Sequence, residues 1–185
     1  GVFLGMGLAV LFFSFRFLYK TVYPVLVAVQ SIPKLALAPL LVIWFGFGGI
    51  SKIVLSGLLT LFPVMVNMIK GLDSASPELI DLLDSLQAHA GEILWKIRIP
   101  YSLPSVFTGL KIAAPLAVVG AVIGEFIGSN KGLGYLIMLA SVNLDTSRMF
   151  VALFILALIG VGFFGLICFL ERIMLPWHVD MYRRK

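Results

Sequence analysis

Charged residues are scarce in this sequence. Only 12% of its 185 residues are Asp, Glu, Lys or Arg, against about a quarter in an average globular domain, while 61% are hydrophobic. A soluble domain of this size has too much surface for so few charges to cover. The shortage of charge therefore argues against an ordinary soluble domain and indicates a chain solvated by membrane lipid.

Cysteine and histidine are also nearly absent. Cys168 is the one cysteine, which excludes an internal disulfide, and its apolar surroundings favour a small buried hydrophobe. His89 and His178 are far apart and lack companion ligands, so a metal site is not expected. No G-x-x-x-x-G-K-[ST] phosphate loop occurs, and we therefore expect no bound cofactor and no ATPase activity in this chain.

Long apolar runs are what the sequence has instead. A spanning helix needs about 20 apolar residues, and the runs 1–15, 53–69, 106–127 and 150–170 reach or approach that length. A fifth run, 22–47, is interrupted by prolines and polar residues, which predicts a kinked or broken span. The sequence thus predicts an all-α, polytopic membrane helix bundle of about five spans.

Small residues recur along the 106–127 run and just beyond it. Their spacing lets a neighbouring helix approach closely, which indicates packing rather than a specific function. The residues are Ala113, Ala117, Gly120, Gly124 and Gly128.

The basic residues indicate how the spans are oriented. If the polar stretch 71–100 is cytoplasmic, alternation of the spans places Lys52, Lys131 and Arg148 outside. The larger inside set is Arg16, Lys20, Lys70, Lys96, Arg98, Arg172, Arg183, Arg184 and Lys185. Lys111 is expected to extend to the cytoplasmic interface, and Lys34 is unassigned. This positive-inside pattern accounts for the net charge of +5 without nucleic acid as a partner.

The stretch 71–100 carries strong helix signals. Ser76 is placed as an N-cap, Pro77 suits the first helical position, and acidic residues follow in the first turn. Apolar residues then recur at spacings of three and four: Leu79, Leu82, Leu83, Leu86, Ala90, Ile93 and Leu94. The pattern predicts an acidic amphipathic helix, divided at Gly91, that presents one face to a protein partner. The sequence K-I-R-I-P-Y-S-L-P after it predicts a stiff hinge.

This loop resembles the signature of binding-protein-dependent ABC permeases: E-A-A, three residues, G, nine residues, I, two residues, P. Counted back from Pro100, Ile97 falls on the family isoleucine. The family glycine falls on Gln87, and the E-A-A triplet begins at Asp81, so only its first acid is kept. Gly91 lies too late in the chain to replace that glycine.

Other segments are similar to the nitrate, sulfonate, taurine and bicarbonate branch of that family. They are Ile32-Pro33 with Ala38-Pro39-Leu40, Trp44-Phe45-Gly46, Ser51-Lys52-Ile53, Glu125 with Ile127-Gly128, and Gly132-Leu133-Gly134-Tyr135-Leu136-Ile137. The resemblance implies a permease domain over 1–177, with its coupling loop at 71–100, and a short basic cytoplasmic tail at 178–185. Since the family has about six spans, it also implies that one N-terminal span is missing here.

The resemblance further implies a homodimeric pore in the bacterial plasma (inner) membrane. A cytoplasmic ATP-binding subunit and an extracytoplasmic solute-binding protein would be its partners, together with membrane lipid. The loop helix would couple ATP hydrolysis to transport through Asp81, Leu86, Gln87, Ala90, Gly91, Ile97 and Pro100.

Polar residues within or near the spans are candidates for the translocation pathway. They are Gln30, Lys34, Asn67 and Glu125. Bonds between helices explain the first three equally well. Glu125, expected near the outer interface, is either a pathway or gate residue, an exposed anchor, or a structural partner of Lys131 or Arg148. The short apolar segment 135–142 is expected to form a re-entrant or interfacial helix at the outer mouth.

The function expected from these features is a permease subunit of an ABC importer. The solute would be nitrate, a sulfonate such as taurine, bicarbonate or a pyrimidine-type vitamin precursor. A secondary transporter or channel that works without an ATPase is the alternative. An integral membrane enzyme is disfavoured because no cluster of nucleophile, base or metal ligands occurs.

Overall fold

The computed structural model describes all residues except 16, 18–20, 23, 26–27, 29–30 and 177–185, and only the backbone of residues 34 and 35. Every regular element in the described chain is a helix, which confirms the predicted all-α class. The elements are α1 (Val2–Ser14), α3 (Lys34–Phe45), α4 (Gly49–Asp73), α5 (Pro77–Ser85), α6 (Ala90–Ile93), the π-helical turn η1 (Leu94–Arg98), α7 (Ile99–Gly128), α8 (Leu133–Val142) and α9 (Thr146–Met174).

Three helical runs of the described chain are long and apolar enough to cross a membrane. They are α4, the continuous run Ala90–Gly128 that ends in α7, and α9. The two remaining predicted runs contain the shorter helices α1 and α3. Pro33 precedes the first residue of α3, which confirms that the 22–47 run is interrupted.

Helices α4 and α7 form the centre of the bundle and pack at close range. A Cβ atom built on Gly120 would lie 2.6 Å from Cα of Ser56, and one built on Gly124 would lie 2.8 Å from Cγ of Lys52. Only residues without a side chain fit there, so the predicted small-residue face is confirmed as a packing face. Ala113 and Ala117 also line a cleft between α7 and α9.

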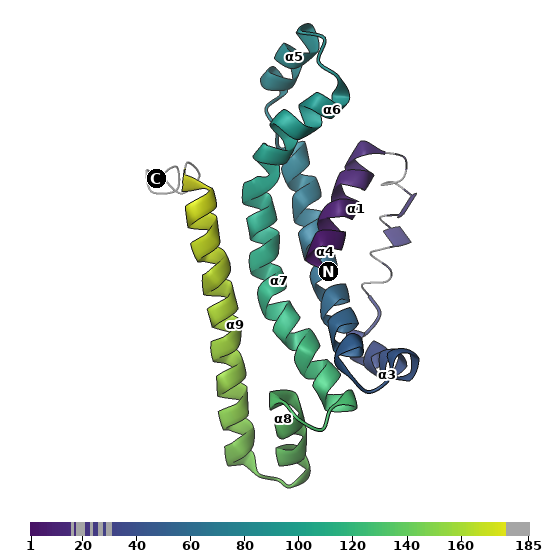
Figure 1. Cartoon of the computed structure of the whole chain (residues 1–185), viewed down its shortest axis with the longest axis vertical. Helices are drawn as coiled ribbons and strands as arrows, with labels where there is room; N and C mark the ends of the chain where they lie inside the picture. Colours follow the sequence, from purple (N-terminus) through teal and green to yellow (C-terminus); the bar gives the residue numbers. More distant parts are fainter. Residues whose placement is uncertain (16, 18–20, 23, 26–27, 29–30, 177–185) are drawn as a thin grey trace.

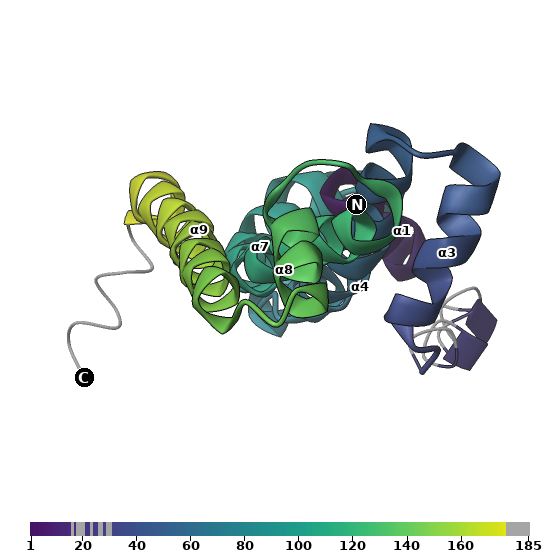
Figure 2. The same cartoon turned by 90° about the horizontal axis from the view of Figure 1, so that it is seen from below.

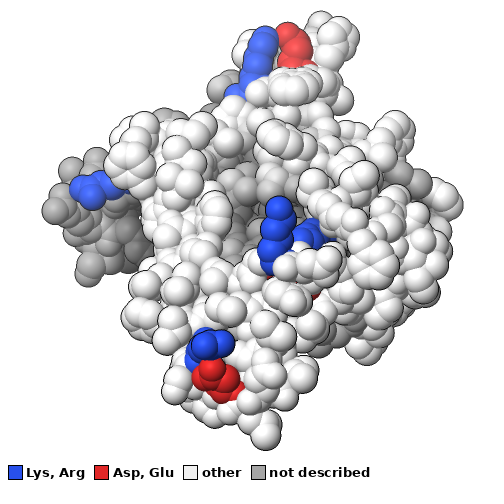
Figure 3. Space-filling model, turned by 60° about the horizontal axis from the view of Figure 1, so that its bottom comes forward, with Lys and Arg blue, Asp and Glu red and all other residues white. Residues whose placement is uncertain are grey.

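The two ends of the molecule carry different elements. Figure 1 shows α5 and α6 at one end and α8 at the other, with α9 running between the two ends at the margin of the bundle. Seen along the bundle, α9 and α3 lie on opposite sides of the α4–α7 centre (Figure 2). On the face drawn in Figure 3, the charged residues of the described chain form small groups separated by uncharged surface.

The predicted loop helix is divided, but not at Gly91. Helix α5 ends at Ser85, and Gln87 takes a left-handed conformation with φ of 56°. Gly91 lies inside α6, which begins at Ala90. The prediction was wrong about the position because glycine lowers helix stability without ending a helix, whereas the left-handed residue reverses the chain direction.

The predicted hinge at Lys96–Pro104 is helical as well. The π-helical turn η1 leads directly into α7, and the Ile99 N–H donates to the Leu94 carbonyl, five residues earlier. Pro100 stands in the first turn of α7, where a missing N–H costs little. The prolines therefore do not separate the loop from the membrane helix.

Candidate functional site

The coupling segment, residues 77–98, stands out from one end of the bundle as a largely exposed surface. None of the residues of α5 is buried. Of the residues expected to act in coupling, Ile97 is half-buried and the others are exposed: Asp81, Leu86, Gln87, Ala90, Gly91 and Pro100. Exposed leucines in an acidic segment fit a protein contact better than free solvent.

Local hydrogen bonds define where the two short helices begin. The Ser76 hydroxyl donates to the Glu78 carboxylate, so Ser76 occupies the predicted cap position but bonds a side chain. This bond is the main reason that the pKa of Glu78 lies below its ordinary value of 4.5. At α6, the carboxylate of Glu92 accepts from the Lys96 ammonium at 2.9 Å and from the His89 N–H at 3.2 Å. Lys96 and then His89 lower the pKa of Glu92.

Arg98 fastens the coupling segment to the membrane helices. Its Nη1 donates to the Leu72 carbonyl at the end of α4 at 3.0 Å, and its guanidinium lies 4.8 Å from the centre of the Phe13 ring in α1. A cavity of about 500 Å³ separates the end of α1 from α5 and α6. The coupling segment is thus attached to α1 and α4 at Arg98, whereas a cavity separates α5 and α6 from the end of α1.

Two exposed apolar side chains of this surface were not predicted from the sequence to contact a partner. Leu82 is 56% exposed and Trp95 is 69% exposed. Leu82 belongs to the recognised apolar spacing, and an aromatic residue is a common anchor in protein interfaces. The sequence feature that could have identified Trp95 as a contact residue is the presence of a tryptophan in an acidic loop.

A second candidate site lies between α7 and α9. This Glu125 cleft has a volume of about 510 Å³ and is lined by Val2, Thr60, Leu110, Ala113, Ala114, Ala117, Val118, Ala121, Val122, Glu125, Leu133, Leu156, Ile159, Phe163 and Ile167. Glu125 is the one ionisable side chain in that lining. The cleft therefore offers an apolar wall and a single carboxylate.

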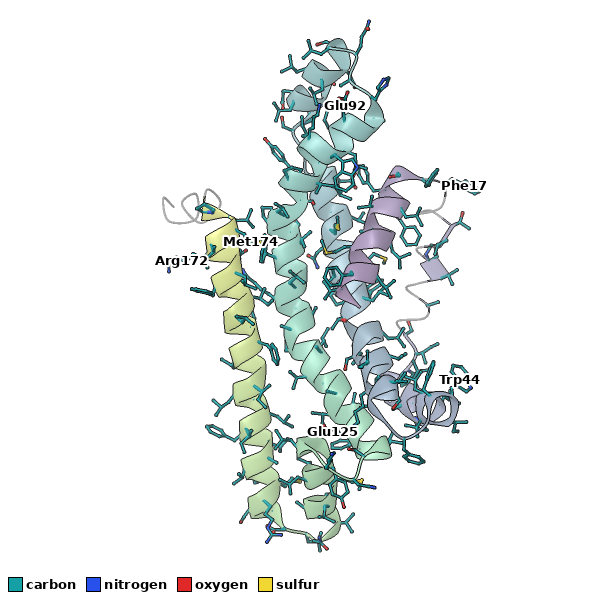
Figure 4. All side chains as sticks on the ribbon, viewed as in Figure 1. Phe17, Trp44, Glu92, Glu125, Arg172 and Met174 are labelled. Carbon is teal, nitrogen blue, oxygen red and sulfur yellow. The ribbon has the colours of Figure 1, made fainter. Side chains whose placement is uncertain are left out.

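The Glu125 carboxylate is held against the start of α8. Its Oε2 accepts the Gly134 N–H at 2.8 Å, which places negative charge at a helix N-terminus, where the helix dipole favours it. A Cβ atom on Gly132, which has φ of 118°, would lie 2.4 Å from this carboxylate. The glycines at 132 and 134 thus make room for Glu125. Figure 4 shows Glu125 beside α8 and far from Glu92 in the coupling segment.

Within the described chain, neither of the basic residues expected to pair with Glu125 forms an ion pair with it. Arg148 pairs with Asp145 at 3.1 Å, and the ion pairs found there do not include Lys131. The predicted ion pair was therefore wrong about the partner, because the carboxylate is bound by the Gly134 N–H and not by a basic side chain. The short helix predicted at 135–142 is present as α8.

Of the other pathway candidates, only Asn67 has a described side chain, and it does not line this cleft. Asn67 is half-buried at the contact of α4 with α7, and its Nδ2 donates to the Pro63 carbonyl at 2.8 Å. Lys34 begins α3, and only its backbone is described. Gln30 lies outside the described residues. Of the two candidates whose side chains the structure describes, Glu125 lines this cleft and Asn67 does not.

Lys111 does not extend freely to the interface as expected. Its Nζ lies 2.5 Å from Oε2 of Glu171 in α9. An opposite charge on a neighbouring helix stabilises the ammonium group of a lysine within the membrane, so the side chain does not need to reach water. Sequence reasoning missed this pair because 60 residues separate its members and only the packing of α9 on α7 brings them together.

Comparison with known proteins agrees with this architecture. The sequence profile of the family "binding-protein-dependent transport system inner membrane component" matches residues 1–175. The formylaminopyrimidine transport permease protein of Halalkalibacterium halodurans is 42% identical over 174 residues, which cover 94% of this chain and 70% of that protein. The riboflavin transport system permease protein of Chloroflexus aurantiacus is 39% identical over 165 residues, 89% of this chain and 62% of that protein.

A more distant relative is the taurine transport system permease protein of Escherichia coli. It is 32% identical over 158 residues, which cover 85% of this chain and 58% of that protein. The chain thus spans between about half and about three quarters of the length of these relatives. The family description and the three helices of crossing length confirm a multi-pass protein of the bacterial inner membrane. The chain belongs to the family of binding-protein-dependent transport system inner membrane components.

Proposed function

We propose that this chain is the membrane-spanning permease part of an importer driven by a separate cytoplasmic ATP-binding subunit and supplied by an extracytoplasmic solute-binding protein. The observation that carries the proposal is the family match over 1–175, nearly the whole chain. Two copies of the chain would form the pore. Exposed apolar side chains on α1, α3 and α9 support contacts with a second copy and with lipid.

The coupling segment is the proposed docking surface for the ATP-binding subunit. Leu86 and Ala90 are exposed on either side of the left-handed turn at Gln87, and Asp81 adds negative charge. Gly91, Ile97 and Pro100 belong to the helical connection toward α7. Attachment through Arg98 supports transmission, because a force on the segment acts directly on α4 and α7.

The Glu125 cleft is the proposed part of the translocation pathway. Its apolar wall suits a planar ring, and its carboxylate suits N–H donors. The same carboxylate would repel nitrate, bicarbonate or a sulfonate. Relatives named for formylaminopyrimidine and riboflavin transport are more similar to this chain than the taurine relative. We therefore favour a heteroaromatic solute of the pyrimidine or flavin type over a small anion.

Reconstitution of the full-length protein tests this function. The protein would be placed in liposomes with the ATP-binding subunit and the solute-binding protein that co-purify with it. Uptake of labelled formylaminopyrimidine, riboflavin, taurine and nitrate would be measured with and without ATP. We expect ATP-dependent uptake of a heteroaromatic compound. Uptake without nucleotide or companion subunit would instead identify a secondary transporter or channel.

A variant of the coupling segment tests the docking surface. Leu86→Lys places a charge in the proposed contact and should abolish co-purification of the ATP-binding subunit. Leu144→Lys is the matched control, because Leu144 is a leucine at least as exposed as Leu86, in the turn between α8 and α9 at the opposite end. Equal binding by the two variants would contradict the proposed surface.

A further inference from the structure

Helix α9 contacts the rest of the bundle along a narrow seam. The Glu125 cleft lies on one side of this seam, and the Phe164 cleft, about 690 Å³ in volume, lies on the other. Val118 and Val122 of α7 and Leu156 of α9 line both clefts and therefore lie between them. None of the residues in the most apolar window of α9 is buried. Within this chain, α9 is therefore held to α7 by a narrow contact.

The Lys111–Glu171 ion pair closes one end of this seam. Lys111 directly follows Leu110, and Glu171 comes about one helical turn after Ile167. Leu110 and Ile167 both line the Glu125 cleft, so the pair lies at its end nearest the coupling segment. Glu125 marks the opposite end, about 21 Å further along α7 at 1.5 Å per residue.

The pair is poorly exposed. The side chains of Lys111 and Glu171 are 27% and 17% exposed, and their charged atoms lie 2.5 Å apart. Beyond this pair, Leu110, Ala114 and Ile167 provide apolar surroundings. Two charges in such surroundings are stable together and costly apart, which favours one closed and one open arrangement over intermediate ones.

We propose that Lys111 and Glu171 form a latch that closes the coupling-segment end of the Glu125 cleft, and that release of solute toward that side requires the pair to separate. This inference rests on the proposed function. Both residues are positioning residues, because they hold α7 against α9 and do not themselves recognise the solute.

Reversible cross-linking tests the latch. Lys111→Cys and Glu171→Cys are combined in full-length protein that also carries Cys168→Ala, because Cys168 lies less than one turn from Glu171. A bifunctional methanethiosulfonate replaces the two side chains, because a lysine and a glutamate joined end to end can span a longer distance than a disulfide. The reconstituted complex is then assayed for ATP-dependent uptake before cross-linking, after it, and after reduction. Each single-cysteine variant, treated in the same way, is the control.

We expect cross-linking to lower uptake by at least about tenfold and reduction to restore it. The single-cysteine controls should be unaffected by the reagent. Uptake within about twofold of the untreated level in fully cross-linked protein would overturn the latch while leaving the proposed function intact. Uptake that needs no ATP in the unmodified protein would instead overturn the proposed function.

A charge exchange provides the second measurement. Lys111→Glu or Glu171→Lys alone places like charges together and should reduce uptake by about tenfold or more, whereas the double exchange should restore most of it. ATP hydrolysis by the complex separates a latch from a purely structural contact. Like charges hold the latch open, which the uncharged cysteine pair does not, so the single charge variants should show continued hydrolysis without uptake. Loss of both in equal proportion, without rescue by the double exchange, would count against the latch.

Discussion

The Glu125 carboxylate accepts a hydrogen bond of 2.8 Å from the Gly134 N–H, so the last part of α7 fixes the first turn of α8. Nine residues separate the two partners, and the left-handed Gly132 lies between them. The sequence Gly132-Leu133-Gly134 therefore leaves space for the Glu125 carboxylate and supplies its hydrogen-bond donor.

Replacing Gly134 with alanine should displace α8. The new Cβ would lie 2.7 Å from the Val122 carbonyl oxygen and 2.8 Å from Cβ of Glu125, and neither can move away cheaply. We expect a loss of about 1–3 kcal/mol in the free energy of unfolding, measured by thermal unfolding in detergent. Gly160→Ala is the control, because no atom lies within 4 Å of a Cβ built there. Similar destabilisation by both variants would contradict the close contact.

Substitution of Glu125 separates its charge from its hydrogen bond. Glu125→Gln keeps an acceptor for the Gly134 N–H and should retain most of the stability, whereas Glu125→Ala should lose about 1.5–3 kcal/mol. Thermal unfolding of the two variants measures this difference. In uptake assays, the Gln variant should discriminate less against anionic solutes, since the repelling charge is gone. Unchanged discrimination would exclude Glu125 from solute selection.

Gln87→Gly should stabilise the coupling segment. A left-handed conformation costs a residue with a side chain about 1–2 kcal/mol, and Gln87 has φ of 56°. Glycine adds about 0.5–1 kcal/mol of backbone entropy to the unfolded state, so the net gain should lie between about 0 and 1.5 kcal/mol. Slower hydrogen exchange at residues 86–93 would report this gain. Ser85→Gly, inside α5, should have the opposite effect.

The start of α6 should weaken in acid. Because Lys96 and His89 lower the pKa of Glu92 below 4.5, the unfolded segment binds protons at a higher pH than the folded one. The stabilisation is therefore complete above pH 4.5 and is lost as the pH falls through the lower, folded value. Hydrogen exchange at residues 90–93, corrected for its intrinsic pH dependence, measures the loss. Glu92→Gln should remove the pH dependence, and its persistence would point to another group.

Features set by local spacing could be predicted from the sequence. The long apolar runs gave the three helices of crossing length, and Ser76 with Pro77 gave the start of α5. The break near Pro33 followed from the chemistry of proline. These signals act within a few residues and do not depend on packing.

Features that depend on a partner distant in the chain could not be predicted. The pairing of Lys111 with Glu171 requires the rotation of α9 about its axis, which hydropathy does not determine. The partner of Glu125 was missed because a backbone N–H has no sequence signature. The turn at Gln87 was missed because glutamine rarely adopts positive φ, although the family pattern has a glycine at that place.

The helical run Ala90–Gly128 is long and continuous, so a rotation at one end displaces the other end. From Ala90 to Glu125 it measures about 52 Å at 1.5 Å per residue, so a rigid tilt of about 5° moves its far end by roughly 4–5 Å. That displacement exceeds the length of the hydrogen bond that holds α8. If the coupling segment rotates as proposed, a small rotation there would be sufficient to part Glu125 from Gly134 at the opposite end of the run.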